Sequence, residues 1–378
     1  MKQKFAIGFS KKRVIVAALA AAGLCSAMGA QAGATVPFGE DKSIGLGLEM
    51  RSSFTSTSDA APSGASRSAD FNLDSMSLKI SASLDKNIKA YFSTDTNAAG
   101  SVQLKDGYAQ FDISPEFNVL AGRVLPPTDR ANLDGPYYAL GWAYPGVVSH
   151  YPSKAFGRDD GVLAWGKLLD KKLVYSVGVF QGRNHVNTTT TSNRDASLLY
   201  AGRVAFNFWD AEPAPLYYTG STYYGSADIL TVALVAQTQK DGVGNNVTKA
   251  DYSAWNIDAL MEKNLGSGVL TLEGAYYSYG FDSAAAAVDV TGGVTPGKAT
   301  LLGGGFLLPG KVGSGKFQPY LRYQSFEEDV TAVQTKQTDV GLNYIIDGSS
   351  AKLSATYTKK DVAAVSANTF VLGMQLQF

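Results

Sequence analysis

The sequence contains almost no cysteine and almost no histidine. Its only cysteine is Cys25, and its only histidines are His150 and His185. Beyond Cys25 the chain has no thiol, which fits an oxidising compartment and a protein that needs no disulfide. Neither histidine stands beside a nucleophile or a second metal ligand, so a catalytic triad or a histidine-based metal site has little to build on. We expect no enzymatic activity, no metal and no cofactor.

The sequence also lacks long apolar runs and an excess of basic residues. Hydrophobic residues make up 45% of it, yet no apolar run reaches the length of about 18 residues that a transmembrane helix needs. Removing the five basic residues of positions 1–32 from a total of 33 leaves 28 basic residues against 33 acidic ones. A nucleic-acid-binding domain would be basic, so we exclude nucleic acid as a partner. A secreted soluble β-protein and an outer-membrane barrel both remain.

Positions 1–32 have the three parts of an export signal. Basic residues lie between Lys2 and Arg13, an apolar run follows at 14–24, and Ala30-Gln31-Ala32 is typical of a cleavage site. The apolar run is too short to span a bilayer. We therefore expect 1–32 to be a cleaved signal peptide and 33–378 to be the folded protein.

The final segment, 369–378, alternates between apolar and non-apolar side chains up to a terminal aromatic residue. Successive side chains of a β-strand point to opposite faces, so this strand has one apolar face. That face carries Phe370, Leu372, Met374, Leu376 and Phe378. A chain ending on such a strand resembles a Gram-negative outer-membrane barrel, and the terminal Phe resembles the signal that the barrel-assembly machinery reads.

Alternating segments of about ten residues, the length of a tilted strand that crosses a bilayer, occur about sixteen times in the sequence. An even number is what a bacterial single-chain barrel requires. We predict an all-β fold, a transmembrane antiparallel β-barrel of about 16 strands with short periplasmic turns and long outer loops. The expected strands lie at 43–54, 71–84, 88–96, 102–113, 117–125, 161–169, 172–180, 198–209, 229–239, 252–263, 268–280, 300–308, 316–328, 336–346, 351–360 and 368–378.

The connections between these segments alternate in length. Short ones such as 85–87 and 347–350 alternate with long ones such as 55–70 and 126–160, as in outer-membrane barrels. The exception is 210–228, which is long but stands where a short periplasmic turn is expected. Either it folds over the periplasmic mouth or it contains an unrecognised hairpin.

The longest outer loop, 126–160, is the expected constriction loop. A lumen of about sixteen strands is wide and filled with water, and a loop of this length can fold inward and narrow it. The alternative is an outer lid that packs on itself. The charged candidates for the constriction are Asp129, Arg130, Asp134, Lys154, Arg158, Asp159 and Asp160.

Strand parity identifies charged side chains that point into the lumen, because Arg or Lys facing lipid at mid-depth would cost about 2–4 kcal/mol. The mid-strand candidates are Lys79, Arg203, Arg322, Asp258 and Glu273, and those nearer strand ends are Glu49, Arg51, Lys89, Glu262 and Lys352. These groups either pair with one another and keep the lumen wet, or set ion selectivity. Six bases against four acids predict a slight preference for anions, which the acidic residues of loop 126–160 could reverse.

Two sets of short motifs carry a family resemblance. The first is Gly157-Arg158-Asp159-Asp160-Gly161-Val162, followed by Gly166, Tyr175, Gly178-Val179-Phe180 and Gly182. The second is Gln318-Pro319-Tyr320-Leu321-Arg322-Tyr323 and Gly341-Leu342-Asn343-Tyr344, followed by Lys352 and Tyr357. From Ala121 onward the chain resembles the phosphate-selective porin family. The resemblance implies a sixteen-stranded pore that assembles as a homotrimer in outer-membrane lipid.

We therefore expect a passive channel of the cell outer membrane for small hydrophilic solutes and ions, with a preference for anions such as phosphate. One alternative is a barrel that serves as a sheath or scaffold for a partner such as a redox protein. Another is a secreted soluble β-rich protein that binds sugars on exposed tyrosines. Single-channel conductance separates an open pore from a filled one, and heat-modifiable migration on a denaturing gel separates a barrel from the soluble protein.

Overall fold

The computed structural model describes residues 33–96, 100–182, 197–244, 249–282 and 294–378. The expected signal peptide 1–32 and His185 lie outside the described residues. The elements are β1 (Ala34–Gly39), β2 (Lys42–Thr57), β3 (Asp70–Ser83), β4 (Ile88–Thr96), β5 (Val102–Ser114), β6 (Phe117–Val124), α2 (Arg130–Tyr138), β7 (Asp159–Leu168), β8 (Leu173–Phe180), β9 (Leu199–Asn207), β10 (Ile229–Gly244), β11 (Lys249–Asn264), β12 (Val269–Phe281), β13 (Gly297–Leu307), β14 (Lys316–Glu328), β15 (Gln334–Asp347), β16 (Ala351–Val362) and β17 (Val365–Gln377).

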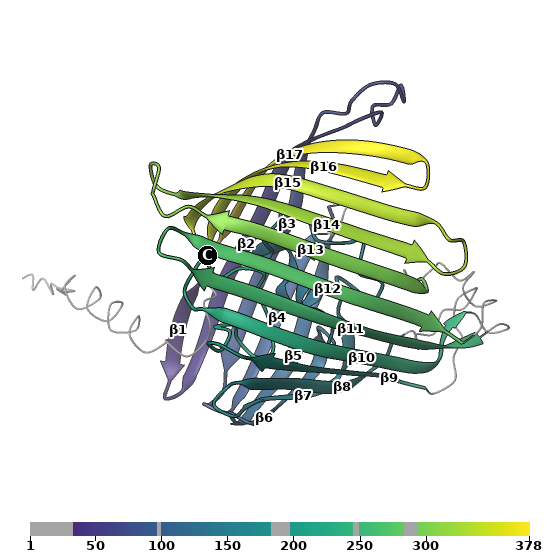
Figure 1. Cartoon of the computed structure of the whole chain (residues 1–378). Coiled ribbons are helices and arrows are strands. Elements are labelled where there is room, and N and C mark those ends of the chain that lie inside the picture. The colour runs from purple at the N-terminus through teal and green to yellow at the C-terminus, as the bar shows by residue number, and fades with distance from the viewer. Residues whose placement is uncertain (1–32, 97–99, 183–196, 245–248, 283–293) are drawn as a thin grey trace, which may run out of the picture.

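Strands β2 to β17 form a closed antiparallel barrel of 16 strands (Figure 1). Each strand pairs with its neighbours in the chain, and β17 pairs with β2 from Thr369↔Thr57 to Gln377↔Glu49. A closed barrel pairs every strand edge, which is what a sheet needs where no water is present to bind the backbone. The predicted fold class is confirmed, and a secreted soluble β-protein is excluded. No helix in the described part of the chain is long and apolar enough to cross a membrane.

One strand, β1, was not predicted. It pairs with the beginning of β2, from Ala34↔Leu46 to Gly39↔Lys42. Phe378 and Leu48 exchange two backbone hydrogen bonds of 2.8 and 3.1 Å. Strands β17 and β1 therefore follow one another along the same edge of β2.

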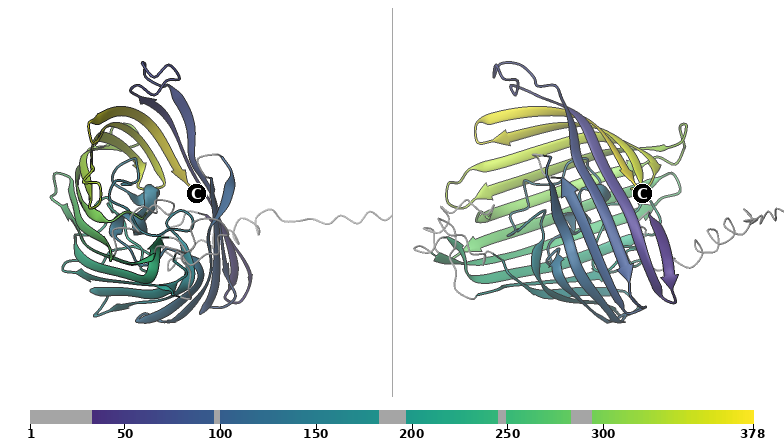
Figure 2. Two further views of the ribbon diagram at one scale, coloured as in Figure 1. Left: turned by 90° about the vertical axis from the view of Figure 1, so that its right-hand side faces the viewer. Right: turned by 180° about the vertical axis from the view of Figure 1, so that it is seen from behind.

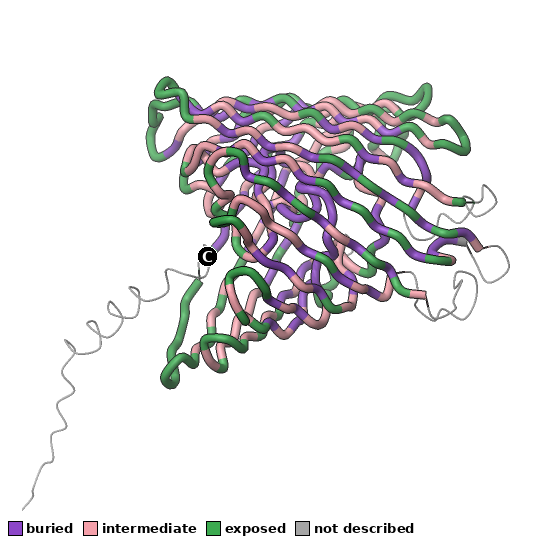
Figure 3. Tube along the Cα trace, turned by 60° about the horizontal axis from the view of Figure 1, so that its bottom comes forward, coloured by how far each residue is buried: buried purple, intermediate pink, exposed green. Residues whose placement is uncertain are grey.

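Side chains alternate between the two faces of the wall, as the buried and exposed positions in Figure 3 show. Leu353 and Leu372 point outward and are 43% and 48% exposed, whereas Ser77 and Gln375 point inward and are fully buried. The outward side chains are apolar because they face lipid in a membrane-spanning barrel. The inward ones are largely polar, in agreement with the predicted parity.

A hydrophobic core lies inside the barrel, between its wall and the loop that follows β6. It includes Leu133 and Val148 of that loop and Tyr252, Tyr277 and Tyr279 of the wall. The hydroxyl of Tyr277 donates to Asp129 at 2.7 Å, and that of Tyr279 donates to the Val148 carbonyl at 2.8 Å. Each ring thus buries apolar surface while its hydroxyl keeps a partner.

The long periplasmic connection does not contain a missed hairpin, because no strand is assigned between β9 and β10. It enters the barrel, where Figure 2 (left) shows chain inside the wall. The hydroxyl of Thr219 donates to the Arg130 carbonyl at 2.9 Å, and the amide of Ser221 donates to the Tyr138 carbonyl at 3.1 Å. We call residues 208–228 the periplasmic plug, and residues 125–158 the inner loop.

Arginine on the lipid-facing side of β17 should destabilise the barrel according to its depth. Leu372 lies in mid-strand and Ser366 near the outer end, and both point outward. We expect Leu372→Arg to lower the free energy of unfolding by about 2–4 kcal/mol and Ser366→Arg by about 0–1 kcal/mol, because the cost falls toward the interface. Urea unfolding in phospholipid vesicles measures both values. Equal losses would contradict the observed register of β17.

Candidate functional site

The inner loop crosses the lumen, and side chains of the barrel wall hold its backbone. Buried carbonyl groups need hydrogen-bond donors, and five wall residues supply them to consecutive parts of the loop. Gln375 donates to Tyr137 O at 2.9 Å, Lys352 to Ala139 O at 3.2 Å, Asn343 to Leu140 O at 2.8 Å, Arg51 to Trp142 O, and Arg322 to Ala143 O at 2.7 Å. The loop is therefore fixed against the wall formed by β2 and β14 to β17.

Two of these donors, Arg51 and Lys352, are cations without a carboxylate partner. They lie on β2 and β16 and are separated by Gln375 of β17, with which both are in register. Within the described residues neither has a carboxylate oxygen within 4.0 Å. The Arg51 guanidinium lies 3.9 Å from the centroid of the Trp142 ring, a cation–π contact, and its Nε has no hydrogen-bond partner. Both residues thus keep unused donors beside the inner loop.

The other lumen-facing cations of the wall are largely neutralised by nearby acids. Four members of the pairs given below, Asp95, Lys105, Asp112 and Asp339, were missed in the sequence analysis, although parity with their outward neighbours could have found them. The pairs are Lys79–Glu49, Lys89–Asp112 at 2.6 Å, Lys105–Asp95 at 2.9 Å, Arg203–Asp258 and Arg322–Asp339 at 2.9 Å. The predicted count of six inward bases against four inward acids therefore left out three acids and one base, and it did not consider that most of these charges pair with one another.

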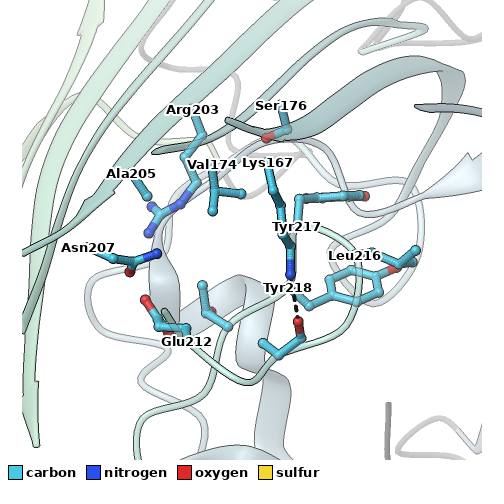
Figure 4. A pocket seen from close by; sticks show the side chains of 12 residues that line it. Lys167, Val174, Ser176, Arg203, Ala205, Asn207, Glu212, Leu216, Tyr217 and Tyr218 are labelled. Carbon is cyan, nitrogen blue, oxygen red and sulfur yellow. Dashed lines mark hydrogen bonds between the residues drawn. The ribbon is translucent and has the colours of Figure 1, made fainter. Parts of the chain in front are cut away.

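The start of α2 lies against the opposite wall, in a buried ionic network. Arg130 makes two hydrogen bonds of 2.7 Å to Glu212 of the periplasmic plug, and its amide donates to Asp258 at 3.2 Å. Arg203 pairs with the same Asp258 and also donates to the Thr128 carbonyl at 3.2 Å. Arg203 and Glu212 line a cavity of about 20 Å³, and Figure 4 shows how the two side chains lie. The network joins wall, loop and plug.

A second set of contacts fixes the middle of the plug. Ser221 donates to Asp134 of α2, and Thr222 donates to Glu262 of β11 at 2.8 Å. The amide of Gly225 donates to the same Glu262 at 2.8 Å. Sequence reasoning missed Glu212 because it treated 210–228 as a connection outside the lumen.

Glycine makes room at two places on β13. A Cβ atom added at Gly303 would lie 2.5 Å from the Oε1 atom of Glu273, and one at Gly305 would lie 2.9 Å from the side chain of Leu140. Contacts this short are sterically forbidden unless a neighbour moves. The two glycines therefore allow Glu273 to point inward and the inner loop to approach the wall.

The seven predicted loop candidates form two groups. Asp129, Arg130 and Asp134 lie deep in the lumen and are buried. By contrast, Asp159 and Asp160 are the first two residues of β7. The candidates nearer the outer end of the barrel form separate ion pairs, which are Lys154–Asp160, Arg123–Asp160 at 2.7 Å and Arg158–Asp106 at 2.9 Å.

Burial changes the charge of the two deep acids. Burial raises the pKa of Asp129 to about 6, although the hydrogen bond from Tyr277 opposes the shift. Burial likewise raises the pKa of Asp134, against the hydrogen bond from Ser221. Asp129, which precedes α2, and Asp134 within α2 therefore carry less negative charge than the sequence implies.

The sequence matches the family model described as phosphate-selective porin O and P over residues 44–378. The chain belongs to this porin family. The resemblance drawn from the motifs is confirmed, and the porin is a channel for passive diffusion. In the described part of the porin, no group of three His, Cys, Asp or Glu side chains could hold a metal ion.

Solved structures share the fold at low sequence identity. An anion-selective porin from Comamonas acidovorans has a TM-score of 0.59 and 14% identity, over 89% of this chain and 100% of that one. Pseudomonas putida OprB has a TM-score of 0.61 and 8% identity, over 89% and 94%. Salmonella typhi OmpF, solved with daunomycin, has a TM-score of 0.59 and 11% identity, over 91% and 100%. A comparison with curated proteins finds no match.

Arg130 and Glu212 should be strongly coupled, because removing one partner of a buried pair leaves the other uncompensated. We expect Arg130→Met and Glu212→Gln each to lower the free energy of unfolding by about 3–5 kcal/mol. The double variant should lose much less than the sum of both. Urea unfolding of all four proteins measures the coupling, and strictly additive losses would show that the plug is not held by this pair.

The raised pKa of Asp129 gives its contribution to stability a definite sign. A carboxyl group whose pKa is about 6 when folded and about 3.9 when unfolded stabilises the fold below pH 4 and loses that effect as the pH rises to 6. Through this group, the free energy of unfolding of the wild type should therefore be about 2–3 kcal/mol lower at pH 7.5 than at pH 4. Asp129→Asn should remove that part of the pH dependence, whereas a profile identical to wild type would contradict the shift.

Proposed function

We propose that this porin prefers small anions, phosphate among them, and that Arg51 and Lys352 set the preference. The observation that carries the proposal is that these two cations face the inner loop without a carboxylate partner among the described residues. Their Cα atoms are two strand spacings apart, about 10 Å. Two positive charges at that separation make the electrostatic potential beside the inner loop positive, which attracts anions into the lumen.

The acids of the predicted constriction loop 126–160 oppose this preference only weakly. Asp129 and Asp134 have raised pKa values, because burial favours their neutral forms. Asp160 is paired with both Arg123 and Lys154. Three of the four acids that could have reversed the sign of the selectivity, Asp129, Asp134 and Asp160, are therefore protonated in part or neutralised by partners.

The inner loop is the proposed constriction, and the periplasmic plug narrows the same region from the other side. A sheath or scaffold is less well supported, since loop and plug occupy space that a threaded partner would need. Phosphate selectivity in the name of the family and anion selectivity in the Comamonas acidovorans porin favour the proposed solutes.

The remaining expectations about this porin are part of the same proposal. We infer that it is a channel and not an enzyme, and that it is exported by the signal peptide 1–32. We infer also that the barrel-assembly machinery inserts it into outer-membrane lipid by its C-terminal strand. A homotrimer is proposed because a similar Vibrio cholerae porin, OmpT, is described in a trimer form.

Replacing either cation by glutamine should weaken anion preference while keeping a donor for the loop carbonyl. A unit charge about 4 Å from a passing ion is worth about 1 kcal/mol in water, so each change should lower the anion-to-cation permeability ratio about fivefold at low salt. The zero-current potential across a planar bilayer in a salt gradient measures this ratio. The effect should shrink between 0.1 M and 1 M salt, as the Debye length falls from about 10 Å to about 3 Å.

Lys311→Gln is the matched control for Arg51→Gln and Lys352→Gln. It removes the same charge from an exposed turn between β13 and β14, far from the inner loop, and should leave the potential unchanged. A wild-type channel that selects cations would refute the proposal. So would unchanged potentials in both lumen variants.

A further inference from the structure

The outer wall of the barrel contains an apolar groove near the closing strand pair. Its volume is about 710 Å³, and it extends across β14 to β17 and onto β2 and β3. β2 and β3 project beyond the rounded part of the wall (Figure 2, left). The lining includes Phe54, Phe71, Leu342, Leu353 and Leu372, all on the lipid-facing phase of their strands.

Three cations border the outer end of this groove. The guanidinium of Arg67 donates to the Ser56 hydroxyl at 3.1 Å and to the Asn368 carbonyl at 3.3 Å. Lys359 is in register with Asn368 and therefore lies beside that contact. Lys336 lies on the adjacent strand, β15, in register with Asp361.

Strand parity connects each cation with the groove beneath it. Leu342 and Lys336 differ by six positions on β15, so their side chains share the outward face. Leu353 and Lys359 differ by six positions on β16 and share it as well. Phe54 precedes Ser56, the partner of Arg67, by two positions on β2. Cations therefore stand at the outer rim above apolar side chains on three strands.

The cations stand at the level of a membrane interface. Tyr357 precedes Lys359 by two positions on the same face, and Phe370 is in register with Tyr357. Aromatic rings of outer-membrane barrels mark the boundary between hydrocarbon and headgroups. Lys359 is about 7 Å further out, where the charged headgroups of the outer leaflet lie.

The balance of charge on this rim favours an anionic ligand. Asp361 lies 3.6 Å from Lys359, and Glu327 of β14 faces outward diagonally across from Lys336, whose register partner is Ser325. Three cations against these two acids leave one positive charge in excess. Lys and Arg side chains bind phosphate groups strongly, and the groove below suits acyl chains.

We propose that this surface binds one phosphorylated glycolipid of the outer leaflet, with its phosphates on Arg67, Lys336 and Lys359 and an acyl chain in the groove. A phospholipid of the inner leaflet would place its headgroup at the opposite, periplasmic end. A neighbouring subunit seated here would have to bury the three cations, which is costly without acidic partners.

Native mass spectrometry of the assembled protein with purified lipid A tests the proposal. Bisphosphorylated lipid A should bind, whereas dephosphorylated lipid A should bind much less. The variant Arg67→Ala/Lys336→Ala/Lys359→Ala should lower the affinity for lipid A by about a hundredfold, because each Lys or Arg near an anionic lipid surface raises the affinity about fivefold. Ala355→Trp, which fills the groove, should also weaken binding.

The matched control is Lys86→Ala/Lys171→Ala/Lys311→Ala, which removes three cations from exposed periplasmic turns and should bind lipid A like wild type. Equal binding of both forms of lipid A, or an unchanged affinity of the rim variant, would overturn the proposal. Cysteine at Ala355 tests the competing occupant, because the expected mature chain has no other thiol. A high yield of disulfide-linked subunits would show that a second copy fills the groove, and would also overturn it.

Discussion

The closing pair of strands, β17 with β2, is the contact on which the rest of this porin depends. Unpaired backbone groups are costly in hydrocarbon, so the sheet has no stable form with open edges in a membrane. Closure also fixes the register of β2, and with it the faces on which Arg51 and Phe54 lie. Arg51 points inward to the loop and Phe54 points outward to the groove, although they are only three positions apart on the strand.

Closure leaves a wide lumen, and the chain fills much of it with its own loop and plug. Irregular backbone inside a barrel needs partners for its carbonyl and amide groups, and the wall supplies them with long polar side chains. Arg322 serves two needs at once, since it pairs with Asp339 and donates to the Ala143 carbonyl. The polar lumen of this porin is thus as much a set of anchors for the loop as a path for solute.

Most of the barrel could be predicted from the sequence because a strand with one lipid face and one lumen face repeats every two residues. The same parity assigned Lys79, Arg203 and Arg322 to the inward face, where their side chains form ion pairs. It did not reveal that Arg203 shares Asp258 with the amide of Arg130, because such a contact depends on where an irregular loop runs. β1 was missed since it is short and contains Pro37, and the plug was missed since its anchors, Glu212 and Ser221, have no periodic pattern.

The two unpaired cations show why anchoring and selectivity cannot be separated in this lumen. Lys352 has three donors and gives one to the Ala139 carbonyl, while Arg51 has five donors and leaves its Nε free. A carbonyl group satisfies one donor but does not cancel a full positive charge. The same side chain can therefore hold the loop in place and still attract an anion, whereas a carboxylate partner would have held the cation equally well and removed its field. The choice of backbone carbonyls over carboxylates as partners for Arg51 and Lys352 is what leaves positive charge at the inner loop.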